Sequence, residues 1–266
     1  ERLLSLGTGD PLVMFAEPPG WECVTCGRIM ASDANECQCG GVLQRAAVPL
    51  HLGDRLTFLR RLGAGGMGVV YKAVDNRIRQ ERAVKTMSRT EPTLAARLRQ
   101  EAQAMAVATH PNLAIVHGLE IWRDIPLLVM EYLPGGTLAT RLRQAPIPPS
   151  MAINWGLQLA LALQAVHHAG MLHRDIKPSN IGFTADDTPK LLDFGLAKLI
   201  PVDPALASTL STHADSTASV ASGATAIRGT PAYLSPEILA GGEPSERDDI
   251  WSFSLTLLEM CLGKNP

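Results

Sequence analysis

The stretch best suited to chemistry is His173–Asn180, which reads HRDIKPSN, followed by Asp193-Phe194-Gly195. Hard cations such as Mg²⁺ take oxygen ligands and usually share them with substrate phosphates. Asn180 and Asp193 offer such oxygens, which leaves Asp175 to accept a proton from a hydroxyl group. Lys177 can neutralise charge on a transferring phosphoryl group. The residues favour phosphoryl transfer; the alternative is a chance His-Arg-Asp on a surface loop.

The eight residues of His173–Asn180 and the Asp-Phe-Gly that follows resemble the catalytic loop and the metal-binding motif of the protein kinases. The resemblance is to the serine/threonine branch, because Lys177 lies two residues after Asp175. The stretch Leu62–Tyr71, LGAGGMGVVY, is similar to that of the bacterial serine/threonine kinases. The resemblance covers about residues 55–266.

This family has an α+β fold with two lobes. The resemblance implies a small β-rich N-lobe over about 55–133 and a mainly helical C-lobe over about 134–266. We expect the C-lobe to be incomplete at its C-terminal end, because the chain stops before the last helices that the family normally has.

The resemblance also implies roles for individual residues. Asp175 would orient and deprotonate a Ser or Thr hydroxyl, and Lys177 would stabilise the transferring group. Lys85 would position the ATP phosphates, and Glu101 would position Lys85. The residues expected around Mg-ATP, with Mn²⁺ as a substitute, are Leu62, Gly63, Gly65, Gly68, Val70, Ala83, Lys85, Met130, Glu131, Leu133 and the metal ligands Asn180 and Asp193.

The glycine pattern Gly63-x-Gly65-x-x-Gly68 also occurs in dinucleotide-binding domains, where it leads into a helix. Here it leads into residues 69–74, which are rich in strand-forming side chains. We therefore expect a hairpin whose glycines let backbone N–H groups approach phosphates. One departure from the family is Gly182, where a larger apolar side chain usually forms the floor under the adenine, so nucleotide affinity is in question.

The remaining pattern predicts the elements that must position these residues. Strands are expected at 56–62, 81–85, 115–119 and 127–130, and helices at 94–108 and 151–170. Within the resemblance, the helix that opens at Asp249 anchors the catalytic loop. Gly229–Glu237 resembles the substrate-binding segment, with Ser235 in place of the commoner alanine.

Between these motifs, residues 207–225 are rich in Ser, Thr and Ala and predict a mobile loop. Arg174 precedes the catalytic Asp, and kinases with that arginine commonly use it to bind a phosphate on this loop. Thr225 is the first candidate phosphosite, followed by Ser222 and Thr217, whereas Thr230 is expected to hydrogen-bond near Asp175. The alternative is an insertion without a regulatory role.

Four of the five cysteines lie close together, as Cys23 and Cys26, then Cys37 and Cys39. Two short cysteine pairs separated by a loop can supply four thiolates to a tetrahedral Zn²⁺. Residues 21–45 thus resemble a small zinc ribbon, although the second pair is Cys-x-Cys instead of Cys-x-x-Cys. The alternatives are free cysteines in a flexible tail and a redox pair. We expect residues 1–20 to be a loose lead-in.

Composition narrows the class of protein. The chain of 266 residues is 46% hydrophobic and 19% charged, which suits a folded core. A net charge of -2 gives no electrostatic footprint for nucleic acid. No apolar run is long enough to span a membrane, so we expect a cytoplasmic protein, with tethering outside these residues left open.

The expected partners are protein substrates with Ser or Thr, and a second copy of the chain if the loop is autophosphorylated. The leading function is a protein serine/threonine kinase. The alternatives are a pseudokinase and a zinc-dependent interaction scaffold that binds ATP without transfer.

Overall fold

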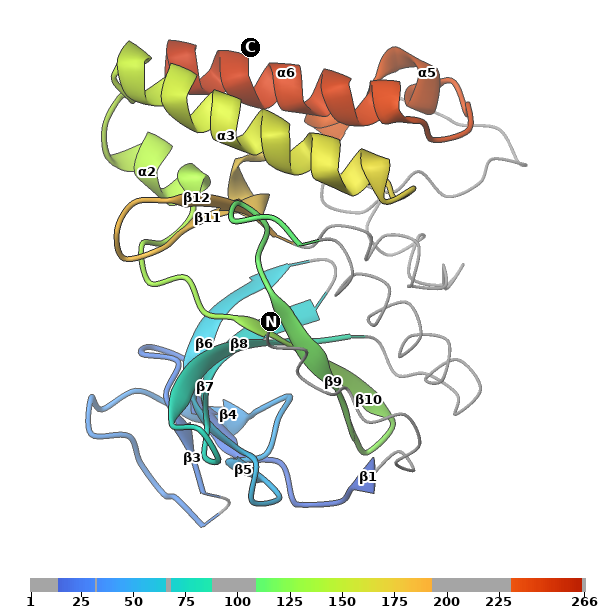
Figure 1. Cartoon of the computed structure of the whole chain (residues 1–266). Coiled ribbons are helices and arrows are strands. Elements are labelled where there is room, and N and C mark those ends of the chain that lie inside the picture. The colour runs from blue at the N-terminus through green and yellow to red at the C-terminus, as the bar shows by residue number, and fades with distance from the viewer. Residues whose placement is uncertain (1–13, 32, 66–67, 88–108, 193–230, 265–266) are drawn as a thin grey trace. The chain divides into compact units, whose positions relative to one another are not determined.

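The computed structural model describes residues 14–31, 33–65, 68–87, 109–192 and 231–264. The chain divides into two compact units, of which the first holds residues 1–103 with Val116–Tyr132 and the second holds Ala104–Ile115 with Leu133–Pro266. In its described residues the first is built of strands, and the second is built mainly of helices (Figure 1).

The first unit contains a sheet whose described strands run in the order β1-β9-β10-β8-β7-β6-β5. Their bounds are β1 Met14–Phe15, β5 His51–Leu52, β6 Leu56–Gly65, β7 Gly68–Asp75, β8 Gln80–Thr86, β9 Val116–Trp122 and β10 Ile125–Glu131. All neighbouring strands along the sheet from β9 through β10, β8, β7 and β6 to β5 pair antiparallel. Short turns join β7 to β8 and β9 to β10. Arg123 and Asp124 in the second turn have φ of 48° and 66°, as hairpin turns of two residues demand.

Residues 14–17 differ from the loose lead-in that the sequence suggests. β1 pairs parallel with β9, and the indole N–H of Trp122 donates to the carbonyl of Glu17 over 3.0 Å. A carboxylate oxygen of Glu17 accepts from the backbone N–H of Gly53 at 2.9 Å. The sequence gives no periodic signal here because a strand of two residues is too short to show one.

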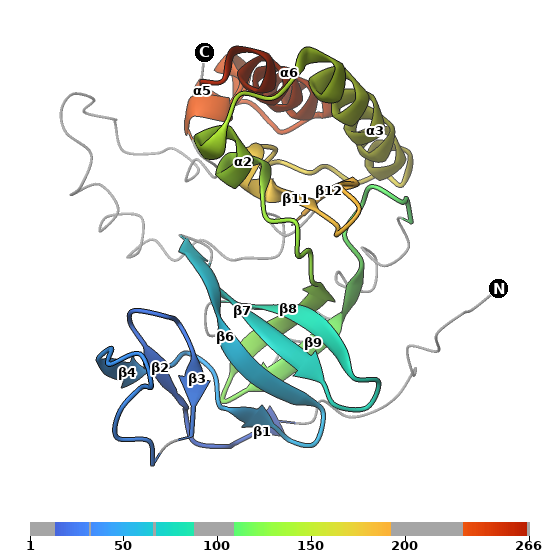
Figure 2. The same cartoon turned by 90° about the vertical axis from the view of Figure 1, so that its left-hand side faces the viewer.

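The cysteine-bearing segment forms a second sheet of three short strands in the order β3-β2-β4. The strands are β2 Trp21–Cys23, β3 Ile29–Met30 and β4 Leu43–Arg45. We call residues 20–48 the cysteine module. Figure 2 shows it beside β6 and β7, and its Ile29, Ala46 and Val48 join the buried core of the large sheet.

The second unit is organised by two helices, α3 Pro149–His168 and α6 Glu246–Leu262. The buried residues of α3 recur at helical spacing and include Trp155, Leu159 and Val166. Gly156 allows close contact between the helices, since a Cβ there would lie 2.8 Å from Leu257 Cδ1 of α6. None of the described helices is long and apolar enough to cross a membrane.

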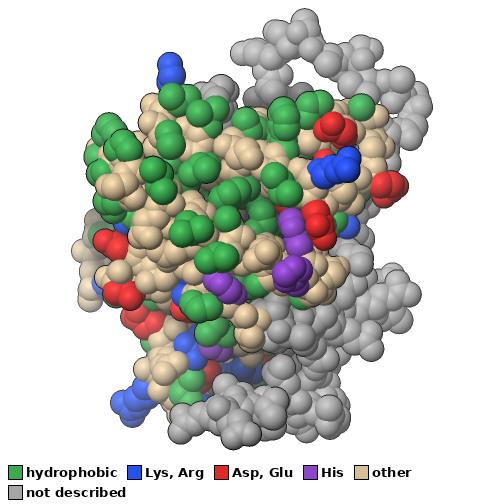
Figure 3. Space-filling view, turned by 45° about the horizontal axis from the view of Figure 1, so that its top comes forward, with side chains coloured by type: hydrophobic (Ala, Val, Ile, Leu, Met, Phe, Trp, Pro, Cys, Tyr) green, Lys and Arg blue, Asp and Glu red, His purple; other side chains and the backbone are tan. Residues whose placement is uncertain are grey.

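Smaller elements complete this unit. They are α2 Leu138–Gln144, the 3-10 turn η1 Pro178–Asn180, the hairpin of β11 Ile181–Phe183 with β12 Pro189–Leu191, the 3-10 turn η4 Pro231–Tyr233 and α5 Pro236–Leu239. Hydrophobic side chains gather on the outer face of the helices in Figure 3. The exposed ones include Ile153, Leu157 and Leu161 of α3, with Ile250 and Trp251 of α6.

Candidate active site and cysteine centre

The predicted base Asp175 lies in a compact polar cluster that precedes and includes η1. Its carboxylate is 2.8–2.9 Å from Lys177 Nζ. The side-chain amide of Asn180 donates to the carboxylate of Asp175 at 2.8 Å and to its backbone carbonyl at 2.7 Å. Asp175 and Asn180 are each 8% exposed. The two groups thus fix the Asp175 carboxylate, as a base that must meet a hydroxyl requires.

The backbone before Asp175 is held in an uncommon conformation. Arg174 has φ of 66°, in the left-handed region that non-glycine residues seldom adopt. Asp249 of α6 accepts from the backbone N–H of Arg174 at 2.6 Å and from that of His173 at 2.8 Å. His167 Nε2 also lies 2.9 Å from Asp249 Oδ2. The buried Asp249 carboxylate therefore stabilises the turn that presents Asp175.

The β11–β12 hairpin brings the predicted metal ligand Asn180 close to Leu192. Leu192, the residue before Asp193, donates its backbone N–H to the carbonyl of Asn180 at 2.9 Å. Asp193 itself lies outside the described residues. Because the NH₂ of Asn180 is engaged by Asp175, its side-chain oxygen remains the group that suits a hard cation.

The unusual Gly182 is explained by its neighbours in the second unit. A Cβ at Gly182 would lie 2.5 Å from Leu133 Cδ1 and 3.3 Å from Leu192 Cδ1. The space that a larger residue would use is thus filled by two leucine side chains. An apolar surface is retained over β11 without a side chain at position 182.

In the first unit, four of the predicted ATP residues share one face of the large sheet. Val70 pairs with Lys85, and Met130 pairs with Ala83, across β7, β8 and β10. Because Ala83 and Lys85 are two residues apart on one strand, all four point to the same side. We call this the nucleotide face; Glu131, one residue after Met130, belongs to the opposite side.

The glycine-rich stretch forms the predicted hairpin of β6 and β7. Gly63 pairs with Val70, and Gly65 pairs with Gly68. Gly68 has φ of 125°, and a Cβ there would collide with the carbonyl oxygen of Thr86. Leu62, the residue before Gly63, is 39% exposed.

Other predicted residues lie outside the described part of the chain. They are Glu101, Asp193, Thr217, Ser222, Thr225 and Thr230.

A cavity of about 300 Å³ lies beside the catalytic loop, within the second unit. Its lining includes Lys177, Arg143 of α2, Tyr233 of η4 and Glu259 of α6. Tyr233 Oη donates to Glu259 Oε2 over 2.5 Å. The cavity thus joins the lysine next to Asp175 with the segment that resembles a substrate-binding loop.

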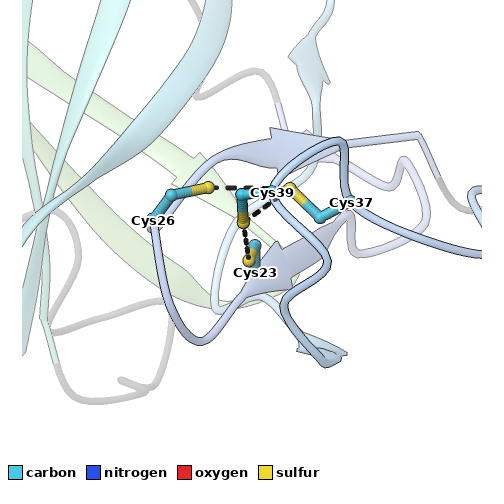
Figure 4. A group of neighbouring side chains, drawn as sticks. All are labelled: Cys23, Cys26, Cys37 and Cys39. Atoms are coloured by element: carbon cyan, nitrogen blue, oxygen red, sulfur yellow. Dashed lines mark hydrogen bonds between the residues drawn. The ribbon is translucent and has the colours of Figure 1, made fainter.

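The four clustered cysteines converge in the first unit (Figure 4). Their sulfur atoms lie within 4.8 Å of one another, and the separations are 3.4 Å for Cys23–Cys39, 3.6 Å for Cys26–Cys37 and 3.5 Å for Cys37–Cys39. These are far longer than the ~2.05 Å of a disulfide. They approach the ~3.8 Å edge of a tetrahedron of sulfurs bound to Zn²⁺ at ~2.3 Å.

The thiols of this centre differ in acidity. A hydrogen bond from the backbone of Cys26, the largest influence, helps to lower the pKa of Cys23 to about 6. For Cys39 the backbone of Gly41 favours the thiolate, but the thiols of Cys23 and Cys37 outweigh it and raise the pKa to about 12. Neighbouring thiolates repel one another, so each deprotonation makes the next less favourable. A bound cation would offset this repulsion.

The sequence does not predict the contacts of two residues, Glu22 and Ser235. Glu22, beside Cys23, is 2% exposed and binds two residues of the glycine-rich hairpin. Ser235 caps α5 by accepting from the N–H of Ile238 at 3.1 Å, and it donates to the Asp248 carboxylate. A charged residue inside the apolar pattern of β2 was the available signal for Glu22.

Comparison with known proteins places these features in a family. The family model of the protein kinase domain matches residues 56–266. Serine/threonine-protein kinase PknB of Mycobacterium leprae is 34% identical over 226 residues, which cover 82% of this chain and 34% of that protein. Serine/threonine-protein kinase pkn2 of Myxococcus xanthus is 33% identical over 223 residues, covering 82% of this chain and 25% of that protein.

The crystal structure of the Mycobacterium tuberculosis PknI kinase domain superposes with a TM-score of 0.58 at 24% identity, covering 79% of this chain and 75% of that one. The predicted two-lobed fold is thereby confirmed. The chain spans about a third or less of the length of the curated relatives. The match to the domain, together with these relatives, shows that the chain belongs to the protein kinase family and resembles its bacterial serine/threonine members.

Proposed function

We propose that this protein transfers the γ-phosphoryl group of ATP to Ser or Thr hydroxyls of proteins. The observation that carries the proposal is the cluster in which Lys177 and Asn180 both contact the carboxylate of Asp175, two and five residues away. Family membership implies ATP and Mg²⁺. Relatives named serine/threonine-protein kinases support the choice of hydroxyl.

The proposed roles follow from this geometry. Asp175 would accept the proton of the hydroxyl, and Lys177 would offset charge on the transferring group. Asn180 and Asp193 would hold Mg²⁺, which would position the phosphate oxygens and neutralise their charge. On the nucleotide face, Lys85 would bind phosphate oxygens, with Glu101 as the residue that orients it.

The adenine and the phosphates would be bound by the first unit together with residues 131–133. The backbones of Glu131 and Leu133 would bind the base, and the glycine-rich hairpin would cover the phosphates. The apolar contacts would come from Leu62, Val70, Ala83 and Met130. The protein substrate would use the cavity beside Lys177, where Glu259 and Arg143 offer charges of both signs.

Asp175→Asn tests the proposal. The amide keeps the shape of the side chain but removes the proton acceptor, so phosphate transfer to a generic basic protein should fall by at least ~100-fold. ATP binding should stay within about twofold, because Asp175 acts on the hydroxyl. Retained turnover in this variant would show that the base is misassigned. ATP binding without transfer by the unmodified chain would instead identify a pseudokinase.

We also propose that Cys23, Cys26, Cys37 and Cys39 hold a structural Zn²⁺. Four thiols at nearly tetrahedral separations, in a module of very short strands, support this assignment. In the first unit, zinc would stabilise the cysteine module and would not contact the reacting phosphate. Chelator titration with metal analysis tests it.

Control by phosphorylation is proposed for the loop after Asp193. A phosphothreonine carries about -1.5 to -2 charge and suits the planar fork of an arginine such as Arg174. Thr225 is the first candidate and Ser222 the second, while Thr230 would contact the catalytic loop. Mass spectrometry after incubation with Mg-ATP, for the wild type and for Thr225→Ala, tests this; an unmodified loop in a fully active enzyme contradicts it.

A further inference from the structure

The cysteine module covers the face of the large sheet opposite the nucleotide face. Tyr71 and Val84 lie between nucleotide-face residues along β7 and β8, so their side chains point to the other side. Both are at most 1% exposed and share a core with Ile29 and Val48 of the module. The module is thus part of the nucleotide-binding unit by its packing.

A buried glutamate next to the four-cysteine centre contacts both strands of the glycine-rich hairpin. Glu22 Oε2 accepts from the hydroxyl of Tyr71 on β7 at 3.1 Å, and Oε1 lies 3.1 Å from a guanidinium nitrogen of Arg61 on β6. Glu22 directly precedes Cys23 on β2. A buried charge requires such partners, so the position of β2 and that of the hairpin depend on each other.

The turn that carries Cys23 and Cys26 makes a second contact with the glycine-rich hairpin. The N–H of Gly27 donates to the carbonyl of Cys23 at 2.8 Å, which closes the turn between Cys23 and Cys26. The carbonyl of Gly27 then accepts from the N–H of Arg61 at 2.8 Å. Gly27 has φ of 70°, and a Cβ there would lie 3.2 Å from the carbonyl of Arg61, so glycine permits this approach. Arg61 lies two residues before Gly63.

We propose that metal in the four-cysteine centre acts as an allosteric activator: it holds the glycine-rich hairpin in place and raises nucleotide affinity. The inference rests on the zinc site proposed above. Strands of two or three residues cannot hold the cysteine module together alone, so loss of the metal releases Glu22 and Gly27 from the hairpin. By linkage, a metal that strengthens nucleotide binding is itself bound more tightly when nucleotide is present.

The test uses the whole chain, loaded with Zn²⁺ or stripped with a chelator. A non-hydrolysable ATP analogue is titrated by calorimetry, and hydrogen exchange is followed in residues 59–72. We expect stripping to weaken analogue binding by about fivefold or more. Exchange at the backbone N–H of Arg61 should become faster. Equal affinity and equal exchange in the two forms would overturn the proposal.

Two variants separate the connection from the metal site. Glu22→Gln removes the charge, and Tyr71→Phe removes only the hydroxyl; both should bind one equivalent of zinc, yet show a smaller affinity ratio between loaded and stripped forms. Glu36→Gln is the matched control, because Glu36 is an exposed glutamate of the same module. A ratio in both Glu22→Gln and Tyr71→Phe equal to that of the wild type would contradict a route through these contacts.

The outcomes also separate the proposals from one another. Metal analysis that finds no zinc in the loaded chain rejects the zinc site and this inference together. Because the measurement is analogue binding, a chain that binds nucleotide but transfers no phosphate rejects the proposed kinase activity alone.

Discussion

Asp249 binds the backbone N–H of Arg174 at 2.6 Å across 75 residues of sequence. This contact holds a residue with φ of 66° next to the proposed base. We expect Asp249→Ala to leave one buried and one partly buried N–H group without an acceptor and to lower the free energy of unfolding by about 3 kcal/mol. Phosphate transfer should fall at least ~10-fold, with nucleotide affinity little changed.

Urea unfolding and initial-rate measurements check this prediction. Glu246→Gln is the control, since its side chain is 61% exposed on the first turn of the same helix. If the Asp249→Ala protein were as stable and as active as the control, the turn before Asp175 would not depend on the Asp249 carboxylate.

Ser235 is predicted to contribute to stability in a way that an alanine cannot. Its hydroxyl caps α5 and donates to Asp248, which caps α6 with Ser245. Ser235→Ala should therefore cost about 1–2 kcal/mol of unfolding free energy. Ser254→Ala is the matched control, because this exposed serine donates to the carbonyl of Ile250 within its own helix. Equal melting temperatures for the two variants would contradict the prediction.

His117 of β9 should make the stability pH-dependent. Burial, the largest cause, and the charge of Arg82 lower its pKa to about 4. The unfolded chain takes up the proton near pH 6.5 and the folded one does not, so stability is full above ~6.5 and declines as the pH falls toward ~4.

Allowing for partial solvent screening, the loss attributable to His117 is about 2 kcal/mol. His117→Gln should remove this part of the stability loss at low pH. His168→Gln, at an exposed histidine, is the control and should leave it in place. Urea midpoints at pH 7.5 and 4.5 provide the comparison. If the His117→Gln protein kept the pH dependence of the wild type, a group other than His117 would be responsible for it.

The cysteine centre predicts about one Zn²⁺ per chain. Cys39→Ser should lower both the zinc content and the melting temperature, because a tetrahedral site needs all four thiolates. Cys261→Ser, at an exposed cysteine outside the centre, should change neither. Zinc content that is unaffected by Cys39→Ser would exclude Cys39 as a ligand.

The sequence predicts most of the elements that carry chemistry, because their signals are local. The long apolar pattern of 151–170 corresponds to α3, and the glycine spacing to the β6–β7 hairpin. It does not predict how the cysteine module packs, since that depends on pairs such as Glu22 and Tyr71, 49 residues apart. For the same reason Gly182 looked like a missing floor, although Leu133 and Leu192 fill that space.

The parallel pairing of β1 with β9 sets an order of events during synthesis. Met14 pairs with Ile121, so the first strand meets its partner only after more than a hundred further residues have been added. At ~5–20 residues per second, the cysteines of the module precede that partner by on the order of ten seconds. With the proposed Zn²⁺, the nascent chain could load the centre before the sheet forms, and the loaded centre would then offer Glu22 and Gly27 as a template on which β6 and β7 assemble.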